Sequence, residues 1–168
     1  MRAAILAIVL AICACQPQSS TGGIPVYSYE VVHAYPHDPR AFTEGLFYLN
    51  GFLYESTGIV GESSVRKVKL ETGEILRAHE VPVPYFGEGI VNWKGRLLQL
   101  TYQTQVGFVS DLGTFAPIGE FKYSGEGWAL TQDGKRIIMS DGTPELRFWV
   151  RKPCGRPAGW RLRPMAAR

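Results

Sequence analysis

The chain has 168 residues, of which 45% are apolar and 12% are aromatic, and its formal net charge is +3. This length and composition predict one globular domain. All 15 acidic residues lie between Glu30 and Glu145, and residues 3–150 contain 11 of the 18 basic residues, so residues 3–150 have a net charge of −4. The charge therefore gives no support for a clustered basic face, and we expect no nucleic-acid partner.

Residues 1–15 have the pattern of a signal peptide of the lipoprotein type. Arg2 precedes an apolar run over 3–12, which is shorter than the ~20 residues that a bilayer span needs. Ile12-Cys13-Ala14-Cys15 is similar to a bacterial lipobox in which Cys15 would be lipidated. We expect an exported protein, periplasmic or anchored to the outer membrane through Cys15, with plain secretion as the alternative.

Residues 16–24 are polar and rich in Gly and Ser, which predicts a flexible linker. The run over 25–35 is rich in β-branched and aromatic residues, and we expect a strand there. His33 and His37 are four residues apart, but Pro36 and Pro39 disfavour the helix on which that spacing would place two metal ligands. We expect solvated or strand-end histidines and no metal site.

A Glu-Gly pair recurs three times, at Glu44, Glu88 and Glu126, with spacings of 44 and 38 residues. Each pair leads to an apolar run, a turn pair, a second apolar run and then a small hydroxyl residue. The turn pairs are Asn50-Gly51, Lys94-Gly95 and Asp133-Gly134. The repeat indicates a structural period rather than three independent motifs.

The repeat units are expected to consist of antiparallel strands and tight turns. The expected strands are 46–49, 52–54, 63–70, 75–83, 106–109, 115–123 and a run from about 146 to 150, with hairpins also at Lys94-Gly95 and Asp133-Gly134. Four strands in roughly 40 residues are the size of one propeller blade. We therefore predict an all-β fold over 25–150, an incomplete β-propeller of about two and a half blades, with a β-sandwich as the alternative.

Residues 151–168 differ in composition from the rest. They contain no acidic residue, five arginines and no strand pattern. A basic tail for nucleic acid or membranes is one interpretation. We expect instead an aberrant, frameshifted tail on a truncated domain.

Several motifs in order resemble the plant and bacterial type of glutaminyl cyclase. They are Phe42-Thr43-Glu44-Gly45-Leu46, Tyr54-Glu55-Ser56-Thr57-Gly58, Phe86-Gly87-Glu88-Gly89-Ile90, Leu100-Thr101-Tyr102-Gln103, Glu126-Gly127-Trp128-Ala129-Leu130 and Ser140-Asp141-Gly142. The family often has Gln at the position of Glu44 and Trp at that of Tyr102. The resemblance implies a five-bladed propeller enzyme that converts an N-terminal glutamine of a peptide or protein to pyroglutamate and ammonia, without a metal or cofactor.

The resemblance also implies roles for individual residues. Glu88 is expected to be the general acid and base, and Glu44 to orient the substrate amine or to tune Glu88. Trp128 is expected to be an apolar platform for the glutamine side chain, and Glu126 is expected to bind substrate as well. The other expected substrate-binding residues are Phe42, Phe86 and Tyr102, and, as weaker amide partners, Ser56, Thr57, Thr101 and Gln103.

The residues by themselves leave alternatives open. The Glu-Gly pairs could only cap strands, and the aromatic residues could only pack between blades. The alternative functions are a non-catalytic propeller that binds a peptide or sugar, and a glycosidase with paired carboxylates. For the truncated chain we expect weak or no cyclisation.

Overall fold

The structure is a computed structural model that describes residues 24–151 and 162–165. The expected signal peptide, Cys15 and most of the linker lie outside the described residues. The chain divides into two compact units, 1–33 and 34–168. In the described part of the chain, no helix is long and apolar enough to span a membrane.

The strand expected over 25–35 is not formed, and that prediction is wrong. The described residues before Thr43 form no strand. β-branched and aromatic residues favour a strand mainly through packing against a partner strand, so composition alone does not produce one.

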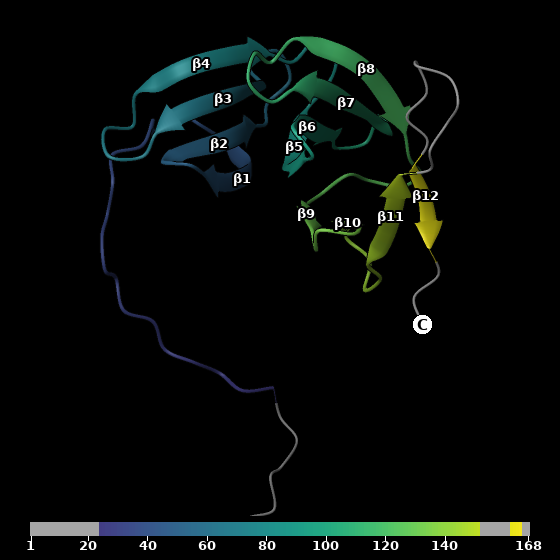
Figure 1. Cartoon of the computed structure of the whole chain (residues 1–168), viewed down its shortest axis with the longest axis horizontal. Coiled ribbons are helices and arrows are strands. Elements are labelled where there is room, and N and C mark those ends of the chain that lie inside the picture. Colours follow the sequence, from purple (N-terminus) through teal and green to yellow (C-terminus); the bar gives the residue numbers. More distant parts are fainter. Residues whose placement is uncertain (1–23, 152–161, 166–168) are drawn as a thin grey trace, which may run out of the picture. The chain divides into compact units, whose positions relative to one another are not determined.

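The described residues of the second unit form three four-stranded antiparallel sheets, and each repeat unit contributes to one sheet (Figure 1). In every sheet, strands that follow one another in the chain are neighbours. The first sheet contains β1 (Thr43–Leu49), β2 (Phe52–Thr57), β3 (Ser64–Lys69) and β4 (Ile75–Glu80). The second contains β5 (Gly87–Trp93), β6 (Arg96–Thr101), β7 (Val106–Asp111) and β8 (Pro117–Lys122). The third contains β9 (Leu130–Gln132), β10 (Ile137–Met139), β11 (Arg147–Arg151) and β12 (Leu162–Met165). The all-β prediction is confirmed.

Two of the predicted hairpins have the backbone that their sequences demand. Asn50 and Gly51 have φ values of 50° and 86°, and Lys94 and Gly95 have 53° and 77°. Positive φ at both central residues is the signature of the type I′ turn, whose twist matches that of the flanking strands. These turns set the register between β1 and β2 and between β5 and β6.

Several strand boundaries differ from the expectation, and one strand was not expected. The strand expected over 75–83 ends at Glu80. The expectation of no strand in the tail is wrong for Leu162–Met165, which pairs antiparallel with β11. Backbone hydrogen bonds to a neighbouring strand need no alternation of side chains, so the sequence pattern did not reveal β12. The frameshift interpretation of the tail stays a prediction.

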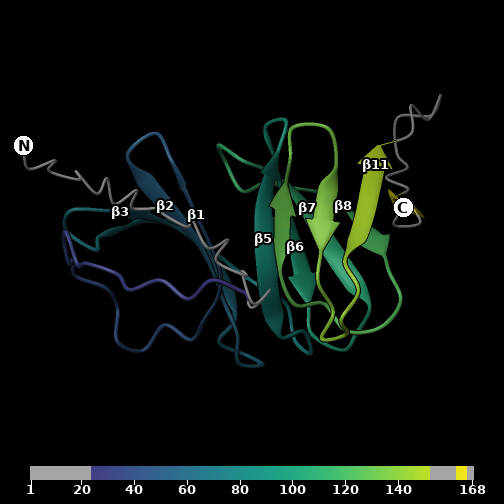
Figure 2. The same cartoon turned by 90° about the horizontal axis from the view of Figure 1, so that it is seen from below.

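The second sheet contributes to two separate apolar cores. Leu98, Leu100 and Val109 pack with residues of the third sheet such as Ile137 and Met139. Residues of the opposite face pack with the first sheet, and this smaller core consists of Tyr54, Val65, Ile90, Leu97 and Phe115. Figure 2 shows the strands of the second sheet between those of the first sheet and β11. The second sheet is thus the middle layer of the unit.

Within this arrangement the first strands of successive sheets are neighbours. β1 contacts β5, and β5 contacts β9. The amide of Gly89 donates to the carbonyl of Trp128 over 2.8 Å, and the amide of Gly127 donates to that of Tyr102 over 2.7 Å. The three Glu-Gly pairs are therefore brought to one region of the unit.

Candidate active site

Glu44 and Glu88 both lie where the strand register is irregular. The register of β1 with β2 shifts at Glu44, and that of β5 with β6 shifts at Glu88 and Gly89. A β-bulge turns a side chain away from the regular alternation of the strand, and bulges are common beside active sites. The repeat thus places two carboxyl groups at two bulges on neighbouring strands.

The glycine of each pair has its own structural reason. A Cβ atom on Gly45 would lie 2.7 Å from the backbone nitrogen of Ile90, and one on Gly89 would lie 2.5 Å from the carbonyl oxygen of Trp128. Real Cβ contacts are longer, so only glycine allows this approach of β1 to β5 and of β5 to the chain before β9. The Gly that follows each Glu in the sequence indicates this close contact, although the pattern of the pair alone does not reveal that role.

Glu88 is the buried carboxyl group of the site. Its exposed fraction is 8%. Burial raises its pKa from 4.5 to about 8, and the charges of Glu44 and Glu126 add to the rise. Glu88 therefore holds its proton near neutral pH while remaining able to release it.

Glu44 and Glu126 lie in different surroundings from Glu88. Glu44 is half-buried, and this burial raises its pKa. Glu126 accepts a hydrogen bond from Gln103 Nε2 at 3.1 Å and one from Trp128 Nε1 at 2.9 Å. These bonds lower the pKa of Glu126, so its carboxylate stays ionised beside a Glu88 that is protonated.

Four aromatic side chains expected to bind substrate lie in this region. The rings of Phe42 and Phe86 meet edge to face at a centroid distance of 6.1 Å, and the rings of Phe86 and Tyr102 are also 6.1 Å apart. Trp128 is 45% exposed, and its ring covers Gly142, where an added Cβ would lie 2.6 Å from the indole. The rings of Phe42, Phe86 and Tyr102 thus form one row. Trp128 donates a hydrogen bond from Nε1 to Glu126.

The three hydroxyl residues expected as amide partners are instead buried, and their hydroxyl groups form hydrogen bonds within the protein. Ser56 Oγ accepts from Gln99 Nε2 at 2.7 Å, and Thr101 Oγ1 donates to the carbonyl of Val106 at 2.5 Å. Thr57 Oγ1 accepts from the backbone nitrogen of Ser64 at 2.9 Å. The exposed fractions of the three residues are 2% or less, and these bonds join strands within and between sheets. Their role toward a substrate stays a prediction.

Sequence reasoning gave no role to two buried polar groups beside the carboxylates. The Tyr123 hydroxyl accepts from the backbone nitrogen of Thr101 at 2.9 Å and donates to the Thr101 carbonyl. Asp141 is 6% exposed and is bonded to Thr143 and Arg147, and its charge acts on Glu126. Asp141 directly follows Ser140, the hydroxyl residue that ends the third repeat, and this position is the sequence feature that could have indicated its role.

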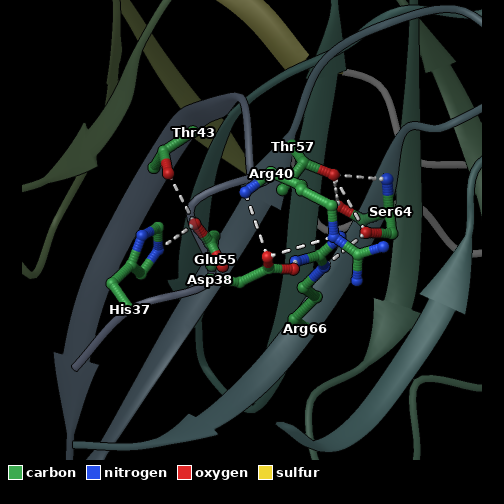
Figure 3. A network of polar contacts seen from close by, with 8 residues as sticks. All are labelled: His37, Asp38, Arg40, Thr43, Glu55, Thr57, Ser64 and Arg66. Atoms are coloured by element: carbon green, nitrogen blue, oxygen red, sulfur yellow. Dashed lines mark hydrogen bonds and ion pairs between the residues drawn. The ribbon is translucent and has the colours of Figure 1, made fainter. Parts of the chain in front are cut away.

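A third missed residue is Glu55 on β2. Glu55 is 2% exposed and bonded to Thr43 and His37, as Figure 3 shows. His37, expected to be a solvated or strand-end residue, thus contacts a buried carboxyl group. Among residues 24–151 and 162–165, no group of three or more His, Cys, Asp or Glu side chains is arranged to hold a metal ion.

Comparison with known proteins agrees with the resemblance of the motifs. A model of the family described as glutamine cyclotransferase matches residues 4–153. A glutaminyl-peptide cyclotransferase of Arabidopsis thaliana is 46% identical over 119 residues, which are 70% of this chain and 37% of that protein. The crystal structure of Myxococcus xanthus glutaminyl cyclase matches with a TM-score of 0.64 and 31% identity, over 76% of this chain and 51% of that one.

The chain therefore spans about a third of the length of the curated relative and about half of the solved structure. Both matches cover most of this chain, and the family model covers all three Glu-Gly pairs and the strands β1 to β11. The family expected from the sequence is confirmed. The chain belongs to the glutamine cyclotransferase family.

Proposed function

We propose that this protein is a glutaminyl-peptide cyclotransferase that converts an N-terminal glutamine to pyroglutamate and releases ammonia. One observation carries the proposal. Glu88 is buried, and this burial together with the charges of Glu44 and Glu126 raises its pKa to about 8. An α-amino group has a pKa of about 7.7 to 8.0. Glu88 is thus matched in acidity to the amine with which it would exchange protons.

The reaction needs one proton to move between two nitrogen atoms. The α-amine attacks the side-chain carbonyl carbon of glutamine, and a C–N bond forms as the carbonyl oxygen takes the charge. The protonated Glu88 gives its proton to the amide nitrogen, and the resulting carboxylate takes a proton from the attacking nitrogen, so that Glu88 is protonated again at the end. The second C–N bond then breaks, ammonia leaves and the ring is closed. Holding the two groups in contact supplies much of the acceleration, about 7 kcal/mol or more at best.

The other residues would hold the substrate in this bent pose. The ionised Glu126, fixed by Gln103 and Trp128, keeps lone pairs for the substrate amine. The exposed face of Trp128 and the row of Phe42, Phe86 and Tyr102 offer apolar surface to the methylene groups of glutamine. Glu44 would orient the amine and, through its charge, keep Glu88 protonated.

We also propose that each four-stranded sheet is one blade of a β-propeller. The contacts of β1 with β5 and of β5 with β9 support this, because first strands of successive blades surround a shared axis. Five blades are proposed from the family resemblance. Export of the protein, with lipidation of Cys15, is proposed from the sequence of residues 1–15.

The proposal is tested by ammonia release from a peptide that begins with glutamine. Peptides that begin with asparagine or with N-acetylglutamine are the substrate controls, since the first would form a different ring and the second lacks the amine. We expect Glu88→Gln to lower kcat by roughly 100-fold or more, because the proton carrier is removed. The matched control is Glu71→Gln, which changes an exposed carboxyl group in the turn before β4.

Two outcomes would contradict the proposal. Equal rates for the wild-type chain and Glu88→Gln would remove Glu88 from catalysis. Tight peptide binding without ammonia release would favour the non-catalytic binding module. The expectation that this chain has weak or no activity stays a prediction, which the same assay measures.

A further inference from the structure

Glu55 is a buried residue that does not belong to the three Glu-Gly pairs, and its carboxyl group is hydrogen-bonded to Thr43, the residue before Glu44. Thr43 Oγ1 donates to Glu55 Oε1 over 2.5 Å, and His37 Nε2 lies 2.8 Å from the same oxygen (Figure 3). Glu55 is 2% exposed. Burying a carboxyl group is costly unless hydrogen bonds replace its hydration, so Thr43 and His37 offset that cost and are themselves held.

The chain that leads into β1 is fastened at further points. Asp38 Oδ2 lies 3.0 Å from Arg66 Nη1 on β3, and the amide of Gly58 donates to the carbonyl of Phe42 over 2.8 Å. Figure 3 shows the contacts of Asp38 and of Glu55, which join residues 37–43 to β3 and β2. Residues 37–43 are therefore fixed against β2 and β3 before the chain reaches Glu44.

Glu44 follows immediately and lies between two fixed neighbours. Thr43 is held by Glu55 on one side. On the other side Gly45 lies so close to β5 that an added Cβ would be 2.7 Å from the Ile90 nitrogen. The strand register shifts between Thr43 and Gly45, so the direction of the Glu44 side chain depends on these two anchors.

We infer that Glu55, with Thr43 and His37, is a positioning network that fixes the bulge at Glu44 and holds the Glu44 carboxyl group near Glu88. The inference rests on the proposed function, in which Glu44 and Glu88 act together. The charge of Glu44 is one of the causes that raise the pKa of Glu88, so displacement of Glu44 would lower the pKa of Glu88. Glu55 acts through Glu44, and it is a positioning residue rather than a catalytic one.

The test uses the full chain and the variant Thr43→Val, which removes the donor hydroxyl at an exposed position and keeps the shape of the side chain. Thr43→Ser keeps the hydroxyl and should restore the wild-type behaviour. Thr131→Val makes the same change at an exposed residue of β9, outside the network. His37→Phe is the second variant of the network and keeps the inference testable if Thr43→Val does not fold.

The measurement is the titration of the Glu88 carboxyl carbon by NMR, assigned by the loss of its signal in Glu88→Gln. We expect Thr43→Val to lower the titration midpoint of Glu88 by roughly 0.5 pH unit or more, and Thr43→Ser and Thr131→Val to leave it unchanged. Where cyclisation is measurable, kcat should fall several-fold in Thr43→Val with little change in KM.

An unchanged midpoint in Thr43→Val, or an equal shift in Thr131→Val, would overturn the inference. The midpoint is measured without substrate, so it tests the network separately from the reaction. Absence of ammonia release by the wild-type chain would count against the proposed function and would leave the titration result standing.

Discussion

Glu88 and Glu126 occupy equivalent places in the repeat, yet their pKa values move in opposite directions. Glu88 is buried, and loss of water is the main cause that raises its pKa. Glu126 lies nearer solvent, where hydrogen bonds from Gln103 and Trp128 favour the charged form. Two carboxyl groups held in different protonation states are what acid-base chemistry at neutral pH requires.

The raised pKa of Glu88 has a consequence for stability. Below pH 4.5 the carboxyl group is protonated in the folded and the unfolded chain. Between the ordinary value of 4.5 and about 8, the unfolded chain loses this proton while the folded chain keeps it. The folded state is therefore increasingly destabilised by Glu88 as the pH rises through this window.

We expect Glu88→Gln to stabilise the protein at high pH. The gain in the free energy of unfolding should be about 1 to 3 kcal/mol larger at pH 8.5 than at pH 4.5, less than the full pKa shift implies because the site is partly solvated. Urea unfolding at a series of pH values measures it, with Glu71→Gln as the control. A gain that does not vary with pH would show that Glu88 titrates alike in both states.

At the scale of elements, the glycines decide how closely the sheets approach one another. The amide of Gly89 donates to the Trp128 carbonyl over 2.8 Å, and an added Cβ would lie 2.5 Å from that same oxygen. The contact that brings β5 to the third sheet therefore excludes every side chain at this position. The same bulge carries Glu88, so the packing of the sheets and the direction of the carboxyl group are linked.

Gly89→Ala is expected to lower the free energy of unfolding by about 1 to 3 kcal/mol, because backbone must move to admit the methyl group. Gly119→Ala is the matched control on β8, where an added Cβ would have no atom within 4 Å. That variant should be neutral or gain up to about 1 kcal/mol through the less flexible unfolded chain. Equal unfolding midpoints in urea for the two variants would refute the close approach.

For the whole molecule, the second sheet is the structural centre of the described unit. Leu97 and Leu98 are adjacent on β6 and point to opposite faces. Leu97 belongs to the core with the first sheet and Leu98 to the core with the third, with exposed fractions of 2% and 0%. One strand thus supports two interfaces.

Substitution of these two leucines should separate the interfaces. Each change to alanine is expected to cost about 2 to 5 kcal/mol. We expect amide hydrogen exchange to accelerate first in β2 and β3 for Leu97→Ala, and first in β10 and β11 for Leu98→Ala. The same loss of protection in all three sheets for both variants would mean that the sheets open only together.

The sequence predicted the features that depend on neighbours along the chain. The turn pairs at Asn50-Gly51 and Lys94-Gly95 demanded their backbone conformation, and the Glu-Gly period predicted one sheet for each repeat. The prediction of a strand over 25–35 was wrong because a strand needs a partner strand, which the residues of the segment itself do not specify. The burial of Ser56, Thr57 and Thr101 was equally hidden, because their partners come from other strands.

The sequence by itself determined the all-β class, the three repeats and, through its motifs, the family. Only the tertiary structure distinguished Glu88 from Glu44 and Glu126 by burial, and only it joined Glu55 to Thr43 and His37. The physical reason is the same in both cases. Turn geometry and alternation are local properties of the backbone, whereas the solvation and hydrogen bonding of a carboxyl group depend on residues that the fold brings from elsewhere.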